Sequence, residues 1–168
     1  EELHPYYRKG IRVKRVLADE QTQYQHLQFV ETEFFGNAMI LDGIIQLTER
    51  DNMGYHEMIV HVPMLAVENP KRVLIVGGGD GGSLQQALRY ESVEEVVVCE
   101  LDQRVVDLSR QFFTASFGDP WLDKRATLLV RDAFGYLEEN PGQFDVIISD
   151  TTDPIGMAER LFSDELQK

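Results

Sequence analysis

The second half of the sequence is built from short, nearly continuous apolar runs that alternate with segments of helical pattern. The runs are Arg72 to Val76, Val93 to Cys99, Ala126 to Val130 and Phe144 to Ile148. Helical patterns lie between them at 83–90, 103–113 and 134–139. Strands that are buried on both faces have this continuous Val and Ile character, and strands joined by helices form parallel sheets from βαβ units. The alternation therefore predicts a doubly wound, Rossmann-like α/β domain.

The first part of the sequence has a different pattern, and the two parts meet at Glu68-Asn69-Pro70. Short stretches separated by turn residues predict a small antiparallel sheet with strands at 11–16, 24–30, 37–41 and 44–47. A helix is predicted from about Asp51 to His61, with Pro63 bending or ending it. We therefore expect a β-sheet region with a connecting helix over residues 1–69, followed by the Rossmann-like domain over 70–168.

Charge and hydropathy restrict the partners. Sixteen Lys and Arg against 29 Asp and Glu give 168 residues a formal charge of −13. Such a surface repels phosphate backbones, so we expect no nucleic-acid partner and favour cationic small molecules. The longest apolar stretch, Met58 to Val67, is too short to span a bilayer, so no membrane partner is expected. The single Cys99 cannot form an internal disulfide, which is typical of the reducing cytoplasm.

A glycine-rich loop follows the first apolar run, with the sequence Gly77-Gly78-Gly79-Asp80-Gly81-Gly82. It matches the dinucleotide-binding pattern, although a tight turn that needs positive φ explains the glycines equally well. Asp80 stands where a pyrophosphate would rest, and a carboxylate there repels phosphate but attracts an ammonium or sulfonium group. The loop therefore favours a nucleoside with a positive charge over NAD.

Carboxylates also mark the ends of the later runs. Glu100 follows the second run, in the position that accepts hydrogen bonds from ribose hydroxyls, and Asp132 follows the third. Asp150 and Asp153 follow the fourth. Ligands of open α/β sheets bind at the carboxyl ends of the strands, so these residues predict an acidic cleft for a cationic ligand. The four histidines lack the spacing of a metal site, and no metal is expected.

Taken together, these motifs resemble the polyamine aminopropyltransferase family, and most closely its members that make spermidine. The resembling segments are Tyr24-Gln25, Phe35-Gly36-Asn37, Leu41 to Gln46, Thr48 to Asp51, Tyr55 to Met58, Val76 to Gly82, Cys99 to Asp102 and Ser149 to Gly156. Their order and the pairing of the glycine loop with Asp-Thr-Thr-Asp-Pro-Ile-Gly are specific to this family. Ala133 and Met157 depart from its usual residues.

The resemblance implies transfer of an aminopropyl group from decarboxylated S-adenosylmethionine to putrescine, which yields spermidine and methylthioadenosine. It implies that Asp150 is the general base and that Tyr55, Asp150 and Asp153 bind the diamine. The implied donor-binding residues are Gln25, His56, Gly77, Gly79, Asp80, Glu100, Asp132 and Ala133. No metal or tightly bound cofactor is implied, and a homodimer or homotetramer is expected. The family's fold continues past strand four, so we also expect the sequence to be a fragment whose C-terminal part is missing.

Two alternatives stay open at this point. An S-adenosylmethionine-dependent methyltransferase shares the glycine loop and the ribose-binding acid. An inactive module that only binds a nucleoside or forms dimers is the other reading of an incomplete α/β domain.

Overall fold

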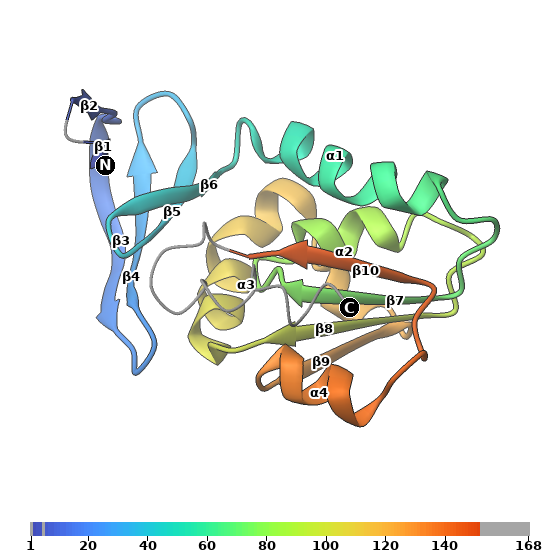
Figure 1. Ribbon diagram of the computed structural model, residues 1–168. Helices are drawn as coiled ribbons and strands as arrows, with labels where there is room; N and C mark the ends of the chain where they lie inside the picture. The colour runs from blue at the N-terminus through green and yellow to red at the C-terminus, as the bar shows by residue number, and fades with distance from the viewer. Residues whose placement is uncertain (1, 5, 152–168) are drawn as a thin grey trace.

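The computed structural model describes residues 2–4 and 6–151, and these form two four-stranded sheets, a short hairpin and the helices around them (Figure 1). The hairpin pairs β1 (Glu2–His4) with β2 (Tyr7–Arg8). Helix α1 (Asn52–Leu65) leads from the first four-stranded sheet to the second. Among the described residues, no helix has the length and apolarity needed to cross a membrane.

The first sheet is an antiparallel meander in the order β3-β4-β5-β6. Its strands are β3 (Val13–Gln21), β4 (His26–Thr32), β5 (Asn37–Leu41) and β6 (Ile44–Thr48). Asp42 and Gly43 both have positive φ, as a two-residue hairpin turn of this hand requires, which explains the Asp-Gly pair between β5 and β6. The apolar face of the sheet, with Phe29 and Met39, packs against Val105 and Phe113 of helix α3 (Gln103–Phe117).

The second sheet is parallel, in the order β10-β7-β8-β9, and confirms the predicted doubly wound α/β fold. Its elements alternate along the chain: β7 (Arg72–Gly77), α2 (Gly82–Ala87), β8 (Glu95–Glu100), α3 (Gln103–Phe117), the 3-10 turn η1 (Pro120–Leu122), β9 (Ala126–Val130), α4 (Ala133–Glu139) and β10 (Val146–Asp150). The carboxyl ends of its strands point toward the small sheet (Figure 1).

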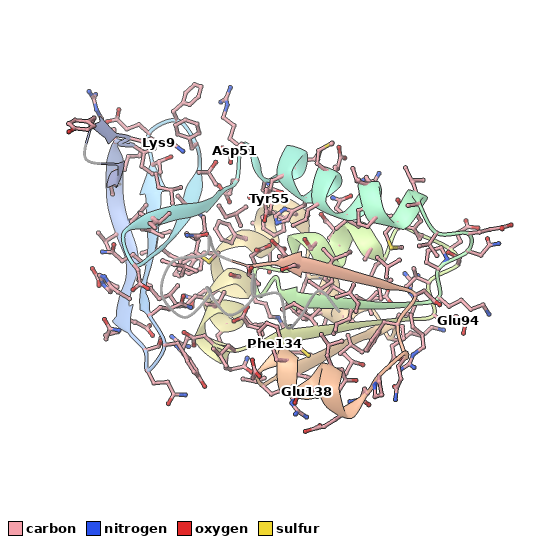
Figure 2. The ribbon with its side chains drawn as sticks, in the orientation of Figure 1. Lys9, Asp51, Tyr55, Glu94, Phe134 and Glu138 are labelled. Atoms are coloured by element: carbon pink, nitrogen blue, oxygen red, sulfur yellow. The ribbon has the colours of Figure 1, made fainter. Side chains whose placement is uncertain are left out.

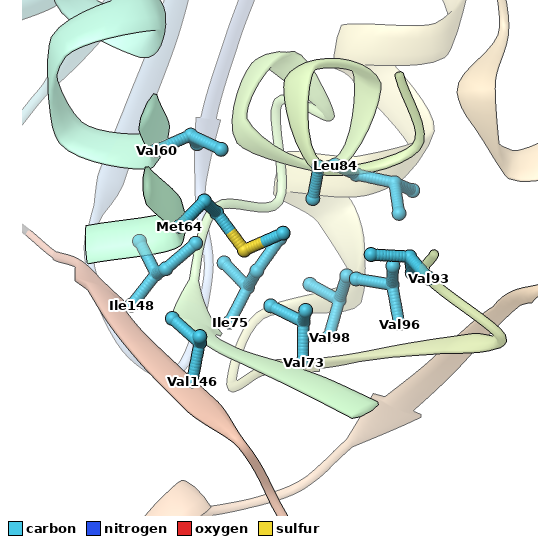
Figure 3. Packing of buried hydrophobic residues seen from close by; sticks show 11 residues of the cluster. Val60, Met64, Val73, Ile75, Leu84, Val93, Val96, Val98, Val146 and Ile148 are labelled. Carbon is cyan, nitrogen blue, oxygen red and sulfur yellow. The ribbon is translucent and has the colours of Figure 1, made fainter. Parts of the chain in front are cut away.

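Helices cover both faces of the parallel sheet. On one face, Val60 and Met64 of α1 and Leu84 of α2 pack against strand residues such as Ile75 and Ile148 (Figure 3). On the other face, α4 covers Leu74, Val97 and their neighbours. Full burial of a Val, Leu or Ile side chain is worth about 1.5–3 kcal/mol, so these layers hold the strand ends in fixed positions.

Several predicted boundaries were wrong by a few residues. Helix α1 continues past Pro63 and ends at Leu65, because a proline in the last turn removes only one backbone donor. Helix α2 ends at Ala87, and the chain then continues to Tyr90 through tighter turns with i to i+3 hydrogen bonds. The β1–β2 hairpin and η1 were not predicted. The division into residues 1–69 and 70–168 stays a prediction.

Candidate active site

A cavity of about 430 Å³ lies between the small sheet and the carboxyl ends of the parallel strands. It collects every predicted site residue that the structure describes: Gln25, Tyr55, His56, Gly77, Gly79, Asp80, Glu100, Asp132, Ala133 and Asp150. Asp153 and Met157 lie outside the described residues. Because these residues come from both sheets and from α1, the cavity requires the two regions to be in contact.

The glycine loop after β7 lies very close to the last residues of the two neighbouring strands, Asp150 of β10 and Glu100 of β8. Gly77 has a φ of 78°, and a Cβ there would collide with the backbone oxygen of Asp150. The next amide, from Gly78, donates to that same oxygen at 2.9 Å. A Cβ at Gly79 would lie 2.7 Å from a carboxylate oxygen of Glu100, which accepts from the Gly79 amide at 3.1 Å. The loop thus needs glycine for close approach as well as for backbone conformation.

Asp80 and His56 form a buried pair at the centre of the cavity. The Nε2 atom of His56 lies 3.2 Å from Asp80 Oδ1, and only 1% of the imidazole side chain is exposed. Burial opposes ionisation of both groups, but their mutual attraction outweighs it, so the pKa of His56 is raised and the pKa of Asp80 is lowered. Neither ring nitrogen has an aligned hydrogen-bond partner among the described residues.

The place of the imidazole depends on Gly82, whose missing side chain leaves the space that the ring occupies. A Cβ on Gly82 would overlap the Cε1 and Nδ1 atoms of His56. We expect Gly82→Ala to push the ring away from Asp80 and to weaken binding of a cationic nucleoside by roughly tenfold or more, the cost of one lost charge-assisted contact. The matched control is Gly54→Ala in α1, where a Cβ meets nothing within 4 Å. Calorimetric titration of both variants checks this, and equal affinities would contradict it.

Asp150 ends β10 and receives a hydroxyl donor on each oxygen. The hydroxyl of Tyr55, which projects from α1 toward this strand end (Figure 2), donates to Oδ1 at 2.9 Å. The hydroxyl of Ser83 donates to Oδ2 at 2.6 Å. Burial and the charge of Asp80 raise the pKa of Asp150, while the two hydroxyls and His56 act in the opposite direction. A carboxyl group with a raised pKa in a cavity is suited to accepting a proton near neutral pH.

Glu100 lies on the opposite side of the glycine loop and accepts hydrogen bonds from backbone amides. Besides Gly79, the amide of Asp102 donates to it at 2.9 Å. Burial dominates over these bonds and raises the pKa of Glu100 to about 7. When ionised, this group is purely an acceptor and can take hydrogen bonds from both ribose hydroxyls, whereas protonation turns one of its acceptor positions into a donor.

This raised pKa predicts that nucleoside binding weakens in mild acid. Below pH 7 the protonated fraction of Glu100 increases, so affinity should fall by up to about tenfold for each further pH unit once protonation dominates. Dissociation constants measured between pH 5.5 and 8.5 would show this dependence. In Glu100→Gln the nucleoside affinity should be low over this whole pH range, and its pH dependence should lack the contribution from protonation of Glu100. An unchanged slope in that variant would assign the titration to another group.

Asp102 is a site residue that the sequence reasoning missed. Its Oδ1 accepts from the amide of Arg104 and begins α3, a role that Asp before a helix commonly has. Its Oδ2 accepts from Thr22 Oγ1 at 2.7 Å and from Gln25 Nε2 at 3.3 Å. These two bonds attach the β3–β4 turn of the small sheet to the parallel sheet and hold Gln25 at the cavity. The cap could be expected from the sequence, but the contacts with the turn could not.

The remaining predicted residues form the outer part of the cavity. Asp132 is exposed, and its side chain accepts from the Gly135 amide at the start of α4. Ala133 is buried beside it, and Phe134 adds an aromatic wall at the α4 side (Figure 2). Arg131, a cationic lining residue, is paired with Glu139 at 2.8 Å. The cavity therefore combines an apolar wall, which suits a flat nucleobase ring, with carboxylates, which suit a cation.

His56, Asp80 and Asp150 each offer one possible ligand atom for a metal, and these atoms lie within 4.8 Å of one another. The two carboxylates also suit an ammonium group, because they accept hydrogen bonds and complement a positive charge. The expectation that no metal is needed stays a prediction.

The fold and the cavity define a Rossmann-like α/β protein with an acidic cavity at the carboxyl ends of its parallel strands. Two family models match the chain: the spermidine synthase tetramerisation domain over residues 1–49 and the spermine/spermidine synthase domain over residues 52–168. The second match alone covers more than half of the chain. The chain belongs to the spermine/spermidine synthase family.

Individual relatives agree with this assignment. A polyamine aminopropyltransferase of Thermococcus onnurineus is 48% identical over 94% of this chain and 56% of its own length. Spermidine synthase 1 of Pisum sativum is 42% identical over 91% of this chain and 46% of its own length. A crystal structure of spermidine synthase in complex with the transition-state analogue AdoDATO has a TM-score of 0.88 at 38% identity, over 92% of this chain and 53% of that one. The chain spans about half the length of the relatives it matches.

Proposed function

We propose that the full-length protein transfers an aminopropyl group from decarboxylated S-adenosylmethionine to putrescine and so forms spermidine and methylthioadenosine. The observation that carries the proposal is the single cavity in which a glycine loop, Asp80, Glu100 and Asp150 come together. The family membership and the named relatives support the same activity.

The proposed donor fits the cavity group by group. Glu100 would accept hydrogen bonds from the ribose, and the wall of Ala133 and Phe134 beside Asp132 would hold the adenine. Asp80 would pair with the donor's propylamine, with His56 and Gln25 beside it. No part of this arrangement requires a metal or a tightly bound cofactor.

The acceptor must lose a proton before it can attack. With an amine pKa near 10.4, only about one putrescine amine in a few thousand is neutral at pH 7. We propose that Asp150 takes this proton as the nitrogen approaches, with Tyr55 and Asp153 binding the diamine. The new C–N bond forms at the aminopropyl carbon while its C–S bond breaks, and the electron pair stays on sulfur. The sulfonium thus leaves as a neutral thioether, and in-line positioning supplies much of the rate.

Calorimetry with two nucleosides, followed by product analysis, tests the proposal on the full-length protein. We expect binding of decarboxylated S-adenosylmethionine and formation of spermidine when putrescine is added. Preference for ordinary S-adenosylmethionine would favour a methyltransferase. Failure to bind either nucleoside would favour a module without catalysis.

We further propose that the protein is a cytoplasmic homo-oligomer that assembles through the small sheet. The match of residues 1–49 to a tetramerisation domain supports this, as do Val13 and Val16 of β3, which are 43% and 55% exposed on an edge strand. The buried thiol of Cys99 is compatible with a reducing compartment. Sedimentation should give a dimer or tetramer, and Val16→Lys should shift it toward the monomer. A wild-type protein that sediments only as a monomer would refute the assembly.

A further inference from the structure

Ser83 stands directly behind the carboxylate of Asp150, outside the set of residues that line the cavity. It lies in the first turn of α2 and is 0% exposed. Its hydroxyl donates to Asp150 Oδ2 at 2.6 Å, and both side chains are buried. This distance lies in the range of about 2.5–2.7 Å that is usual for a hydroxyl that donates to a carboxylate.

The two hydroxyls on Asp150 differ in one respect that matters for catalysis. Tyr55 lines the cavity and is 47% exposed, so a bound amine can compete with its hydroxyl for Oδ1. Ser83, on α2, is 0% exposed and does not line the cavity, so a molecule bound in the cavity does not compete for its hydroxyl. Its bond to Oδ2 therefore persists whether or not the cavity is occupied, and it holds the carboxylate plane while Oδ1 faces the acceptor.

The charged and titratable groups around Asp150 make this bond more important. Tyr55 and His56 face it from α1, and Asp80 faces it from the glycine loop. Asp80 repels a second negative charge, and burial has the same effect, whereas Ser83, His56 and Tyr55 stabilise the ionised carboxylate. Of the two uncharged hydroxyl donors among these groups, Ser83 is 0% exposed whereas Tyr55 is 47% exposed.

We propose that Ser83 is a positioning residue for aminopropyl transfer, whose buried hydroxyl fixes the orientation of the Asp150 carboxylate and favours its ionised form. This inference rests on the proposed function in assigning the base, but the hydrogen bond and its effect on ionisation are properties of the protein alone. Ser83 itself touches neither substrate.

The inference predicts a specific pH effect. Removing the hydroxyl destabilises the ionised form of Asp150, so its pKa should rise by roughly one unit, the usual size of one charge-assisted bond in a buried site. Because the base must be ionised to accept the amine proton, the acidic limb of kcat/KM for the diamine should move upward by the same amount. On that acidic limb, turnover at a given pH should fall by roughly tenfold, and it should recover as the pH rises.

The test compares the full-length wild type with Ser83→Ala, which keeps the helix, and with Ser83→Thr, which keeps the hydroxyl. The matched control is Ser109→Ala, a serine that is equally buried in a helix but is remote from Asp150. The first readout is the titration of the Asp150 carboxyl carbon by NMR, assigned with Asp150→Asn. The second is the pH profile of kcat/KM, together with the dissociation constant of decarboxylated S-adenosylmethionine.

We expect the midpoint and the acidic limb to rise by about one pH unit in Ser83→Ala, with Ser83→Thr and Ser109→Ala close to the wild type and nucleoside affinity changed by less than about twofold. An NMR midpoint that does not move in Ser83→Ala would overturn the inference, whatever the activity. A midpoint that moves in a protein without aminopropyl transfer would support the role of Ser83 in ionisation and refute the proposed function instead.

Discussion

Replacing Asp150 with asparagine in the full-length protein is expected to lower turnover by about two to four orders of magnitude, the usual contribution of a positioned general base. Asparagine keeps the shape of the side chain and a hydrogen-bonding group for Tyr55 and Ser83, but it cannot take a proton from the amine. Affinity for the nucleoside donor should change little, because Asp80 and Glu100 carry most of the proposed contact with it. The variant thus separates chemistry from binding.

The alternative is that Asp150 only supports the turn that follows β10, where its backbone oxygen accepts from the Gly78 amide. Asparagine stabilises turns about as well as aspartate, so under this alternative the variant would turn over almost normally. The rate against pH distinguishes the two, since wild-type activity should decline in acid as the carboxylate is protonated. Retention of more than about a tenth of wild-type turnover at pH 8 would refute the assignment of Asp150 as the base.

Selection of the donor by Asp80 is the second effect that should be large. His56 keeps the pKa of Asp80 low despite burial, so the Asp80 side chain is ionised at neutral pH. In the proposed arrangement it would face the carbon that carries a carboxylate in ordinary S-adenosylmethionine and has lost it in the decarboxylated donor. Two like charges at close range in a partly buried site cost a few kcal/mol. The wild type should therefore bind the decarboxylated nucleoside about a hundredfold or more tightly than ordinary S-adenosylmethionine.

Calorimetry with both nucleosides on Asp80→Asn measures the contribution of this charge. The variant should bind the decarboxylated donor more weakly and should discriminate between the two nucleosides by less than about tenfold. Asp107→Asn is the matched control, because Asp107 is a half-exposed carboxylate on α3 that pairs with Arg104 away from the cavity. A wild type with equal affinities would sink the assignment of Asp80 to the propylamine.

The strands of the parallel sheet and their ends could be predicted from the sequence, because a strand that is buried on both faces consists almost entirely of apolar residues. The run Ala126 to Val130 corresponds to β9 without any shift. The first strand was predicted at 11–16, whereas β3 extends from Val13 to Gln21. Its second half is polar and is held by backbone pairing with β4 as far as Gln21 opposite His26, which leaves no apolar pattern to find.

The site was predictable for residues at strand ends, since parallel strands bring their carboxyl ends together whatever their exact length. Glu100, Asp132 and Asp150 meet at one cavity for that reason. Ser83 and Asp102 were not predictable as site residues, because their partners lie 67 residues away at Asp150 and 80 residues away at Thr22. In the sequence, Ser83 is a common helix residue and Asp102 a common helix cap, and only the tertiary contacts show which side chains they bind. The roles assigned to individual residues stay predictions.

The 95 residues that separate Tyr55 from its hydrogen-bond partner Asp150 also set the timing of biosynthesis. At about 5–20 residues per second, a ribosome adds Asp150 roughly 5–20 s after Tyr55. The small sheet can pair its strands early in that interval, because β3 to β6 are neighbours in the chain. Helix α1 can pack on α2 and β7 soon afterwards, but its contacts with Val146 and Ile148 have to wait, because these are among the last described residues to be made. A nascent chain therefore leaves the part of α1 that faces β10 uncovered for several seconds, and the cavity with its carboxylates is completed only when β10 joins β7.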